Sequence, residues 1–320
     1  MQIVYFGCAF GGFYIYVEYG FVHLPGKYID YYHVYPGSIL MTLCYACYFA
    51  ACWVDPGTIN EKTYAKAVHR FPYDGVLFTK KNKCTTCKFE KPARSKHCSM
   101  CNVCFEKFDH HCIWINGCVG LHNYRYFLAF IFTHFLITFY GVIVGGLIFA
   151  GLIEEKKLIG AKFRNNATGE TIEADWMFII NYMMYHYHAF SFVVMLCMVC
   201  SIMLFIFFVY HMYLVKGGLT TNEKVKLSQM QHYLDKVLSF LQEWLRRKKE
   251  FETDESKDEF KPKKEAIEYY GVKAEMNTKQ IEDKIKSVKK DIEKTKNLPY
   301  TGTSFWGNLY QVMFPNAPFP

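Results

Sequence analysis

Long apolar runs alternate with strongly charged segments along this chain. Four of the runs are long and apolar enough to cross a bilayer, which takes about 20 residues per helix. They cover residues 2–22, 38–54, about 126–153 and about 189–215. The pattern therefore predicts four transmembrane helices, with the charged segments outside the membrane.

The first two runs also have other interpretations. Residues 2–22 could form a cleaved signal peptide, although they have no basic segment in front and no small-residue cleavage site. Residues 38–54 are short and could form a buried core helix instead. Because the two runs lie at hairpin distance from each other, the pairing favours two membrane spans.

The lysines and arginines orient the predicted helices. The loop between the first two runs contains only Lys27, and the loop 154–187 contains four basic residues, whereas the other 32 of the 37 lie between the second and third runs or after the fourth. The positive-inside rule places those two regions and the N-terminus in the cytosol. The sequon Asn166-Ala167-Thr168 falls in the loop that is then lumenal, where glycosylation is possible.

Charge and cysteine content narrow the function further. The net charge of +8 raises the question of nucleic acid. However, the basic residues do not interleave with a reading helix or an aromatic platform, so a membrane surface explains the charge better. Seven of the 13 cysteines lie between Cys84 and Cys118. This segment lies between the second and third runs, which the positive-inside rule assigns to the cytosol. In the reducing cytosol, thiols stay free or hold metal.

The segment from Cys84 to Cys118 has the composition of a metal-binding domain. It contains seven cysteines and three histidines in 35 residues, with C-x-x-C pairs that let two thiolates reach one zinc ion. Two four-coordinate zincs need eight ligands, so a cysteine and a histidine remain. Asp109-His110-His111-Cys112 adds an acid, which completes the set of a nucleophile, its base and an orienting group. The alternative is a zinc-stabilised membrane adaptor that binds cysteine-bearing partners without turnover.

The full pattern, C-x2-C-x9-H-C-x2-C-x2-C-x4-D-H-H-C-x5-C, resembles that of the DHHC protein S-acyltransferases (palmitoyltransferases). Asp55-Pro56-Gly57 and Thr220-Thr221-Asn222-Glu223 resemble two further motifs of that family, and residues 308–314 resemble its C-terminal motif loosely. A RING-type ligase fits the ligand spacing poorly and has no use for Asp109.

The resemblance implies an all-α polytopic membrane protein. Its cytosolic, zinc-binding cysteine-rich domain is expected between the second and third of four transmembrane helices. The expected parts are 1–55 with two helices, 56–123 with the cysteine-rich domain, 124–217 with two helices and a lumenal loop, and 218–320 with the cytosolic tail.

The tail has its own pattern. Leucines and a methionine between residues 227 and 245 predict an amphipathic helix that lies on the membrane or pairs with itself. Residues 246–298 are rich in lysine and glutamate, which predicts a solvated helix or a partly disordered linker. Residues 299–320 are aromatic again, and we expect them to dock on the membrane face.

The resemblance also implies roles for the site residues. Two structural zincs are expected, one on Cys84, Cys87, His97 and Cys104, and one on Cys98, Cys101, His111 and Cys118. Cys112 is the implied nucleophile, which takes the acyl group from acyl-CoA and passes it to a substrate cysteine. His110 is its implied base. Asp109 orients His110, and Thr221 supports Asp109.

Other positions are expected to meet acyl-CoA. Trp114 would line the entrance for the acyl chain. Four residues of the third run recur at helical spacing: Phe127, Phe130, His134 and Ile137. This spacing predicts either one wall of a cavity for the acyl chain or ordinary helix packing. Arg94 and Lys96 resemble positions that meet the CoA phosphates, or are solvated charges.

The expected partners are the lipid bilayer, palmitoyl-CoA and cysteine-containing membrane or peripheral proteins. Phe71-Pro72-Tyr73-Asp74 resembles the branch of the family that acylates SNAREs. This resemblance predicts the endoplasmic reticulum as the organelle, with the Golgi next.

Overall fold

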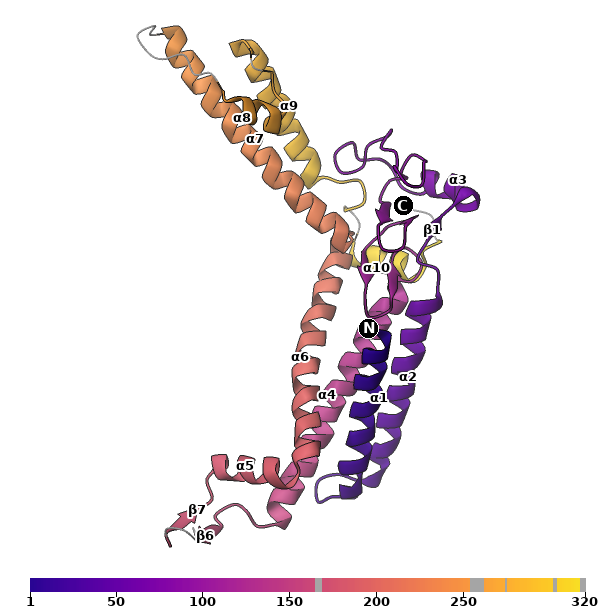
Figure 1. Cartoon of the computed structure of the whole chain (residues 1–320), viewed down its shortest axis with the longest axis vertical. Helices are drawn as coiled ribbons and strands as arrows, with labels where there is room; N and C mark the ends of the chain where they lie inside the picture. Colours follow the sequence, from indigo (N-terminus) through magenta and orange to yellow (C-terminus); the bar gives the residue numbers. More distant parts are fainter. Residues whose placement is uncertain (165–168, 254–261, 274, 302–303, 317–320) are drawn as a thin grey trace. The chain divides into compact units, whose positions relative to one another are not determined.

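The computed structural model describes residues 1–164, 169–253, 262–273, 275–301 and 304–316 (Figure 1). The chain forms two compact units, one made of Met1–Gly57 with His111–Tyr213, the other of Thr58–His110 with Leu214–Pro320. Each unit thus combines two separate stretches of sequence. The predicted sequon at Asn166 lies outside the described residues.

Three helices among the described residues are long and apolar enough to cross a membrane. They match the second, third and fourth predicted spans. They are Tyr31–Trp53, which joins the short turn η2 (Tyr31–His33) to α2 (Val34–Trp53), then α4 (Tyr124–Glu155) and α6 (His188–Lys216). The first begins seven residues before the predicted run 38–54 and ends one residue short of it, whereas α4 and α6 extend their predicted runs by one or two residues at each end.

The first predicted span forms helix α1 (Gln2–Tyr19), followed by the short turn η1 (Phe21–His23). This helix is not among the three candidate spans. Its 18 residues include Gln2, Glu18, three glycines and four tyrosines, which together lower its hydropathy. The fourth span therefore stays a prediction.

Close contacts hold the helices of the first unit together. The hydroxyl of Tyr16 on α1 donates a 2.7 Å hydrogen bond to the carbonyl of Gly141 on α4. A Cβ atom at Gly145 would lie 2.5 Å from Cγ2 of Val194 on α6. Small residues of this kind allow helix backbones to approach closely in a membrane, where burial of apolar surface does not drive association.

The loop expected between the last two spans contains structure that the sequence analysis did not predict. Strands β6 (Lys162–Arg164) and β7 (Thr171–Glu173) form an antiparallel hairpin. Helix α5 (Trp176–His186) follows and leads into α6.

The cysteine-rich segment is not helical throughout, which departs from the all-α expectation. Strands β1 (Thr58–Ile59), β3 (Val103–Phe105) and β2 (Lys96–Cys98) form an antiparallel sheet in that order, flanked by α3 (Glu61–Arg70). Strands β4 (His110–Cys112) and β5 (Gly117–Val119) form a separate pair. Because the candidate ligands are so close in sequence, the chain must turn back on itself more tightly than a helix allows.

The described part of the tail is largely helical, which agrees with the helix alternative for residues 246–298; residues 254–261 and 274 lie outside the described residues. Helix α7 (Thr221–Thr253) packs against α9 (Thr278–Lys296), with α8 (Lys264–Tyr270) between them in sequence and α10 (Phe305–Met313) near the end. The predicted amphipathic stripe of α7 is buried against α9, where Leu234 and Leu241 meet Ile281 and Ile285. The stripe is thus covered by the chain itself.

Candidate active site and metal-binding groups

Strand β4 carries the three central residues of the predicted site. It runs from His110 to Cys112, and Cys112 is its buried end. Successive side chains of a strand point to opposite faces. His110 and Cys112 therefore share one face, and His111 points to the other. This alternation lets two adjacent histidines have different partners.

Asp109 is held in place by the start of helix α7. The backbone N–H of Thr221 donates to Asp109 Oδ1 at 2.7 Å, and the Thr221 hydroxyl donates to Oδ2 at 2.9 Å. The neighbouring Thr220 donates its hydroxyl to the carbonyl of Phe108 at 3.0 Å. The supporting role predicted for Thr221 thus has a direct contact, and it involves the backbone as well as the side chain.

The tautomer of His110 follows from the same carboxylate. Nδ1 of His110 lies 2.6 Å from Asp109 Oδ2. Because a buried carboxylate can only accept, Nδ1 carries the proton, which leaves Nε2 able to accept one. The Asp109 side chain is almost fully buried, whereas a quarter of the His110 ring is exposed. This is the arrangement of a base with its orienting acid.

A buried ion pair anchors the start of α7. Arg94 donates from Nε and Nη2 to the two carboxylate oxygens of Glu223, at 2.7 and 2.6 Å, and the side chains are 1% and 0% exposed. Nη2 also donates to the carbonyl of Gly218, and the guanidinium lies 4.2 Å from the ring centre of Tyr300. Arg94 was predicted to meet CoA phosphates, but the structure places it in the interior of the second unit.

The sequence analysis missed Tyr300, which closes this interior. Its hydroxyl donates to Asp74 Oδ2 at 2.8 Å, and Asp74 Oδ1 accepts from three successive backbone N–H groups that begin at Val76. On α10, Asn308 donates to the carbonyl of Lys216 at 3.1 Å. The aromatic character of residues 299–320 was the available signal, but we interpreted it as membrane docking.

Lys107 stands close to these charges, in the turn between β3 and β4. Burial, together with Arg94, lowers the pKa of Lys107 to about 7, although Glu223 and Asp109 act in the opposite direction. Its backbone is left-handed, with φ of 43°. The folded protein therefore favours the neutral amine more than free solution does.

A separate group of three lysines, which we call the lysine cluster, is Lys91, Lys96 and Lys226. Lys96 donates to the side-chain oxygen of Asn222 at 3.0 Å. Burial lowers the pKa of Lys226, as do the charges of Lys96 and Lys91, whereas Glu223 and Asp74 raise it. The net effect lowers the pKa, so an anion beside Lys226 would relieve part of the repulsion from the two other lysines.

The predicted metal ligands form two groups. One contains Cys84, Cys87, His97 and Cys104, and the other Cys98, Cys101, His111 and Cys118; within each group the ligand atoms all lie within 4.8 Å of one another. His97 Nδ1 is 3.4 Å from Cys87 Sγ, and His111 Nδ1 is 3.5 Å from Cys118 Sγ. Tetrahedral zinc with Zn–S bonds of about 2.3 Å sets its ligand atoms about 3.8 Å apart. Both Cys3His groups fit such an ion, and neither contains His110 or Cys112.

The turn that follows Cys112 is tied to the first two helices. The side-chain amide of Gln2 on α1 donates to the Ile115 carbonyl at 3.3 Å. The hydroxyl of Tyr48 on α2 donates to the Trp114 carbonyl at 3.2 Å. The amide of Asn123, a residue that the sequence analysis missed, donates to the carbonyls of Ala51 and Cys118. Its place just before a long apolar run is typical of a helix start.

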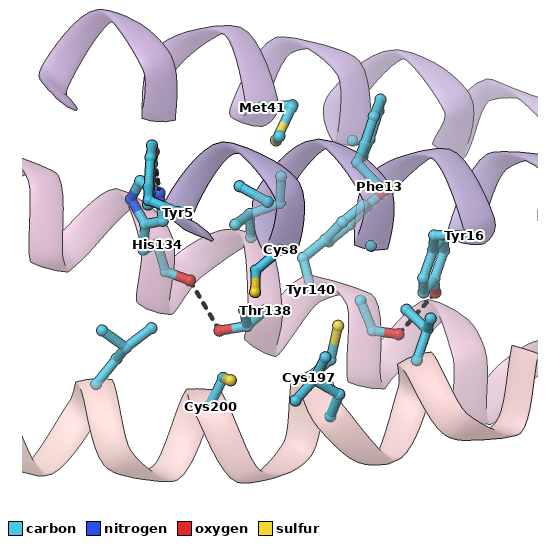
Figure 2. Close-up of a pocket in the computed structure, with 18 of the residues that line it drawn as sticks. Tyr5, Cys8, Phe13, Tyr16, Met41, His134, Thr138, Tyr140, Cys197 and Cys200 are labelled. Atoms are coloured by element: carbon cyan, nitrogen blue, oxygen red, sulfur yellow. Dashed lines mark hydrogen bonds between the residues drawn. The ribbon is translucent and has the colours of Figure 1, made fainter. Parts of the chain in front are cut away.

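A cavity of about 380 Å³ lies within the first unit (Figure 2). Its lining is almost entirely apolar and comes from α1, α2, α4 and α6, with Phe21 of η1 and with Trp114 at the turn after β4. His134 and Ile137 line it as predicted. Phe130 and Phe127 do not line it: Phe130 stacks edge-on against His134, and Phe127 packs in the cluster that contains Cys112.

Comparison with known proteins connects this geometry to a family. Residues 77–228 match the family model described as DHHC palmitoyltransferase. The palmitoyltransferase swf1 of Schizosaccharomyces pombe is 40% identical over 194 residues, 59% of this chain and 49% of that protein. The palmitoyltransferase ZDHHC4 of Bos taurus is 31% identical over 195 residues, 61% of this chain and 57% of that protein. The chain thus spans about half the length of these curated relatives.

Proposed function

We propose, from the DHHC palmitoyltransferase domain that the chain carries at residues 77–228, that this protein is a protein S-acyltransferase. It would move a long-chain acyl group, mainly palmitoyl, from acyl-CoA to cysteines of membrane-associated proteins. The observation that carries the proposal is the clamp of Thr221 on Asp109, with Asp109 paired to His110 on the strand that also holds Cys112. A passive adaptor would have no need of it.

The reaction has two steps with the same base. A free thiol has a pKa of about 8.5, so His110 Nε2 takes the proton of Cys112 and the thiolate attacks the carbonyl carbon of acyl-CoA. The bond to the CoA sulfur breaks, and CoA leaves as a thiol with the proton from His110. A substrate cysteine then gives its proton to His110 and attacks acyl-Cys112. Cys112 leaves as a thiol, and the acyl group is now on the substrate.

Two zinc ions are the proposed occupants of the two Cys3His groups. Structural zinc sites are tetrahedral and closed, and they supply folding energy to segments with little core of their own. The buried apolar cluster beside the first group is small, with Ile59 and Ala67 as its members besides ligands. The zincs would hold the loops around β4 and take no part in acyl transfer.

The cavity is the proposed site of the acyl chain. Each buried CH2 group of a lipid chain contributes about 0.8 kcal/mol, so an apolar cavity binds a long chain strongly. Trp114 lines the cavity two residues after Cys112, which supports an entrance next to the nucleophile. Phe127 and Phe130, beside the cavity, would support its wall from behind.

The lysine cluster is the proposed site of the CoA phosphates. The charges of Lys91 and Lys96 repel that of Lys226, and phosphate oxygens would relieve that repulsion. Lys96 keeps the role that the sequence analysis suggested for it. Arg94 is committed to Glu223, so we assign its predicted role to Lys91 and Lys226.

Helix α1 is the proposed fourth span. Tyr5 and Tyr16 both hydrogen-bond to α4, at His134 and at the Gly141 carbonyl, so α1 runs alongside that candidate span. Its 18 residues extend about 27 Å at 1.5 Å per residue, close to the thickness of the hydrocarbon core. With four spans, the distribution of basic residues supports a cytosolic active site. The endoplasmic reticulum is the proposed organelle, with the Golgi next, and SNAREs are among the proposed substrates.

The test is to incubate the purified full chain with labelled palmitoyl-CoA and measure both hydroxylamine-sensitive label and bound zinc. Cys112→Ser should take no label and keep two zincs. His110→Ala should also keep two zincs but acylate about 10²–10⁴-fold more slowly. His111→Ala should lose zinc. No label on the unchanged chain would favour the adaptor, and loss of zinc from Cys112→Ser would overturn the division into ligands and nucleophile.

A further inference from the structure

Helix α5 has an unusual composition for a loop outside the membrane. Its sequence, WMFIINYMMYH, contains no aspartate, glutamate, lysine or arginine. Its 11 residues span about 16 Å at 1.5 Å per residue, about half of what a membrane span needs. An uncharged apolar helix of this length is either a buried core helix or a helix that lies at a membrane surface.

Only one side of α5 is covered. Ile179 and Met183 are buried in a cluster with Phe190 of α6. Much of the rest of the helix is exposed, including Asn181, and Trp176 in the first turn leaves 66% of its surface uncovered. The other large exposed side chains of the helix are Met177, Ile180, Met184 and Tyr185. This exposure excludes a buried core helix, because a core helix would have both faces covered.

The place of α5 in the first unit makes the bilayer its neighbour. Figure 1 shows α5 running across the direction of α4 and α6, at the end where α4 finishes and α6 begins. Further along the chain, α6 also exposes apolar side chains near its start, Phe192 and Met195. Since α6 is a candidate span, exposed apolar side chains of this kind are suited to lipid. The exposed apolar side chains of α5 are thus followed along the chain by those of a candidate span.

Aromatic side chains mark the membrane boundary at the same end. In the loop between α1 and α2 three tyrosines are exposed, namely Tyr28, Tyr31 and Tyr32, and Tyr35 is exposed in the first turn of α2. This loop meets the end of α4, where Lys27 and Tyr28 bond to Glu154, and it meets the start of α6, where His23 contacts the Tyr187 ring. Tyrosine and tryptophan collect where a bilayer meets water. The four exposed tyrosines and Trp176 are thus residues of the kind found at a bilayer surface.

We propose that α5 is an interfacial helix whose uncovered face lies in the headgroup and acyl boundary of the leaflet at this end of the bundle. The partner that covers this face is phospholipid. A helix of this kind binds through its buried apolar area and lies in the membrane plane. The β6–β7 hairpin just before it carries Lys162, Arg164 and Glu173 and stays in water.

The inner face of α5 packs near the cavity. The inner face of α5 belongs to the same buried cluster as Tyr16 and Val193, and both of these residues line the cavity. Lipid that holds α5 in the membrane plane would therefore also hold this part of the cavity wall.

The experiment measures tryptophan fluorescence of the full chain in lipid nanodiscs, whose two faces are both open to water. The difference between the unchanged chain and Trp176→Phe isolates the signal of Trp176. We expect phosphatidylcholine brominated near the glycerol end of its chains to quench this signal, and aqueous acrylamide to leave it nearly unchanged. Ile172→Trp in the Trp176→Phe background is the matched control. Ile172 is also exposed, but it lies on the charged hairpin, so acrylamide should quench the new tryptophan.

Two results would overturn the proposal. Quenching of Trp176 by acrylamide and not by brominated lipid would place α5 in water. Protection from both quenchers would mean that protein covers this face, either another part of the chain or a second copy. Because the readout does not involve acylation, its outcome is independent of the proposed enzyme function.

Discussion

The buried pair of Arg94 and Glu223 should be essential for stability and should not take part in CoA binding. The perturbation is Glu223→Ala, which removes the acceptor of two charged hydrogen bonds and of the backbone N–H of Thr220. Arg94 would then be left as a buried charge, with the Gly218 carbonyl as its remaining hydrogen-bond acceptor among the contacts described above.

The magnitude follows from the burial of both side chains, which are 1% and 0% exposed. Removal of one partner of a buried ion pair costs about 3–5 kcal/mol, because the other charge stays desolvated. A typical domain is stable by about 5–15 kcal/mol, so this loss is a large part of the total. Acylation should fall as well, because Glu223 lies in the first turn of α7, two residues after the Thr221 that holds Asp109.

The assay combines thermal unfolding of the zinc-loaded chain with the dependence of acylation on acyl-CoA concentration. Glu223→Ala and Arg94→Ala should both lower the unfolding temperature. Arg94→Leu combined with Glu223→Leu should cost less than the sum of the single changes, since no charge is then left unpaired. As a matched control, Lys226→Met should not lower the unfolding temperature, because burial and two neighbouring lysines already disfavour this charge. It should raise the acyl-CoA concentration needed for half-maximal rate.

A different result for Arg94 would refute this reasoning. If Arg94→Ala kept the unfolding temperature and behaved like Lys226→Met, Arg94 would meet the CoA phosphates, as its sequence context suggested. The buried contact with Glu223 would then be irrelevant to stability.

Two further predictions concern the surroundings of the base. Thr221→Val keeps the backbone donor to Asp109 but removes the hydroxyl's hydrogen bond to this charged group, which is worth about 1.5–3 kcal/mol. Single-turnover acylation should therefore slow about ten- to hundredfold, whereas Thr221→Ser should stay near the original rate. Lys107 has a folded pKa of about 7 against about 10.4 unfolded, so the unfolded chain binds more protons between these values and stability rises with pH there. Lys107→Met should therefore gain most in unfolding temperature near pH 7 and lose that advantage towards pH 10; a gain that grew with pH would contradict the assignment.

The sequence alone was enough to predict features that depend on residues close together in the chain. The ligands of the two metal groups lie within 35 residues, and their C-x-x-C pairs need only short turns to reach one ion. The three candidate spans were visible in hydropathy alone, because a bilayer tests each segment separately. The different faces of His110 and His111 needed no more than an extended backbone between them.

What only the tertiary structure decided depends on partners that are distant in sequence. Arg94 and Glu223 are 129 positions apart, so no local pattern could show that this arginine is buried in an ion pair. Helical spacing placed Phe127 and Ile137 on one candidate wall, yet only Ile137 reaches the cavity, because the neighbouring helices determine which part of a face is covered. The apolar stripe of α7 was clear, but its cover could not be known before α9 had folded back on it. Hydropathy records that a surface avoids water, whereas the identity of the group that covers it is determined by long-range packing.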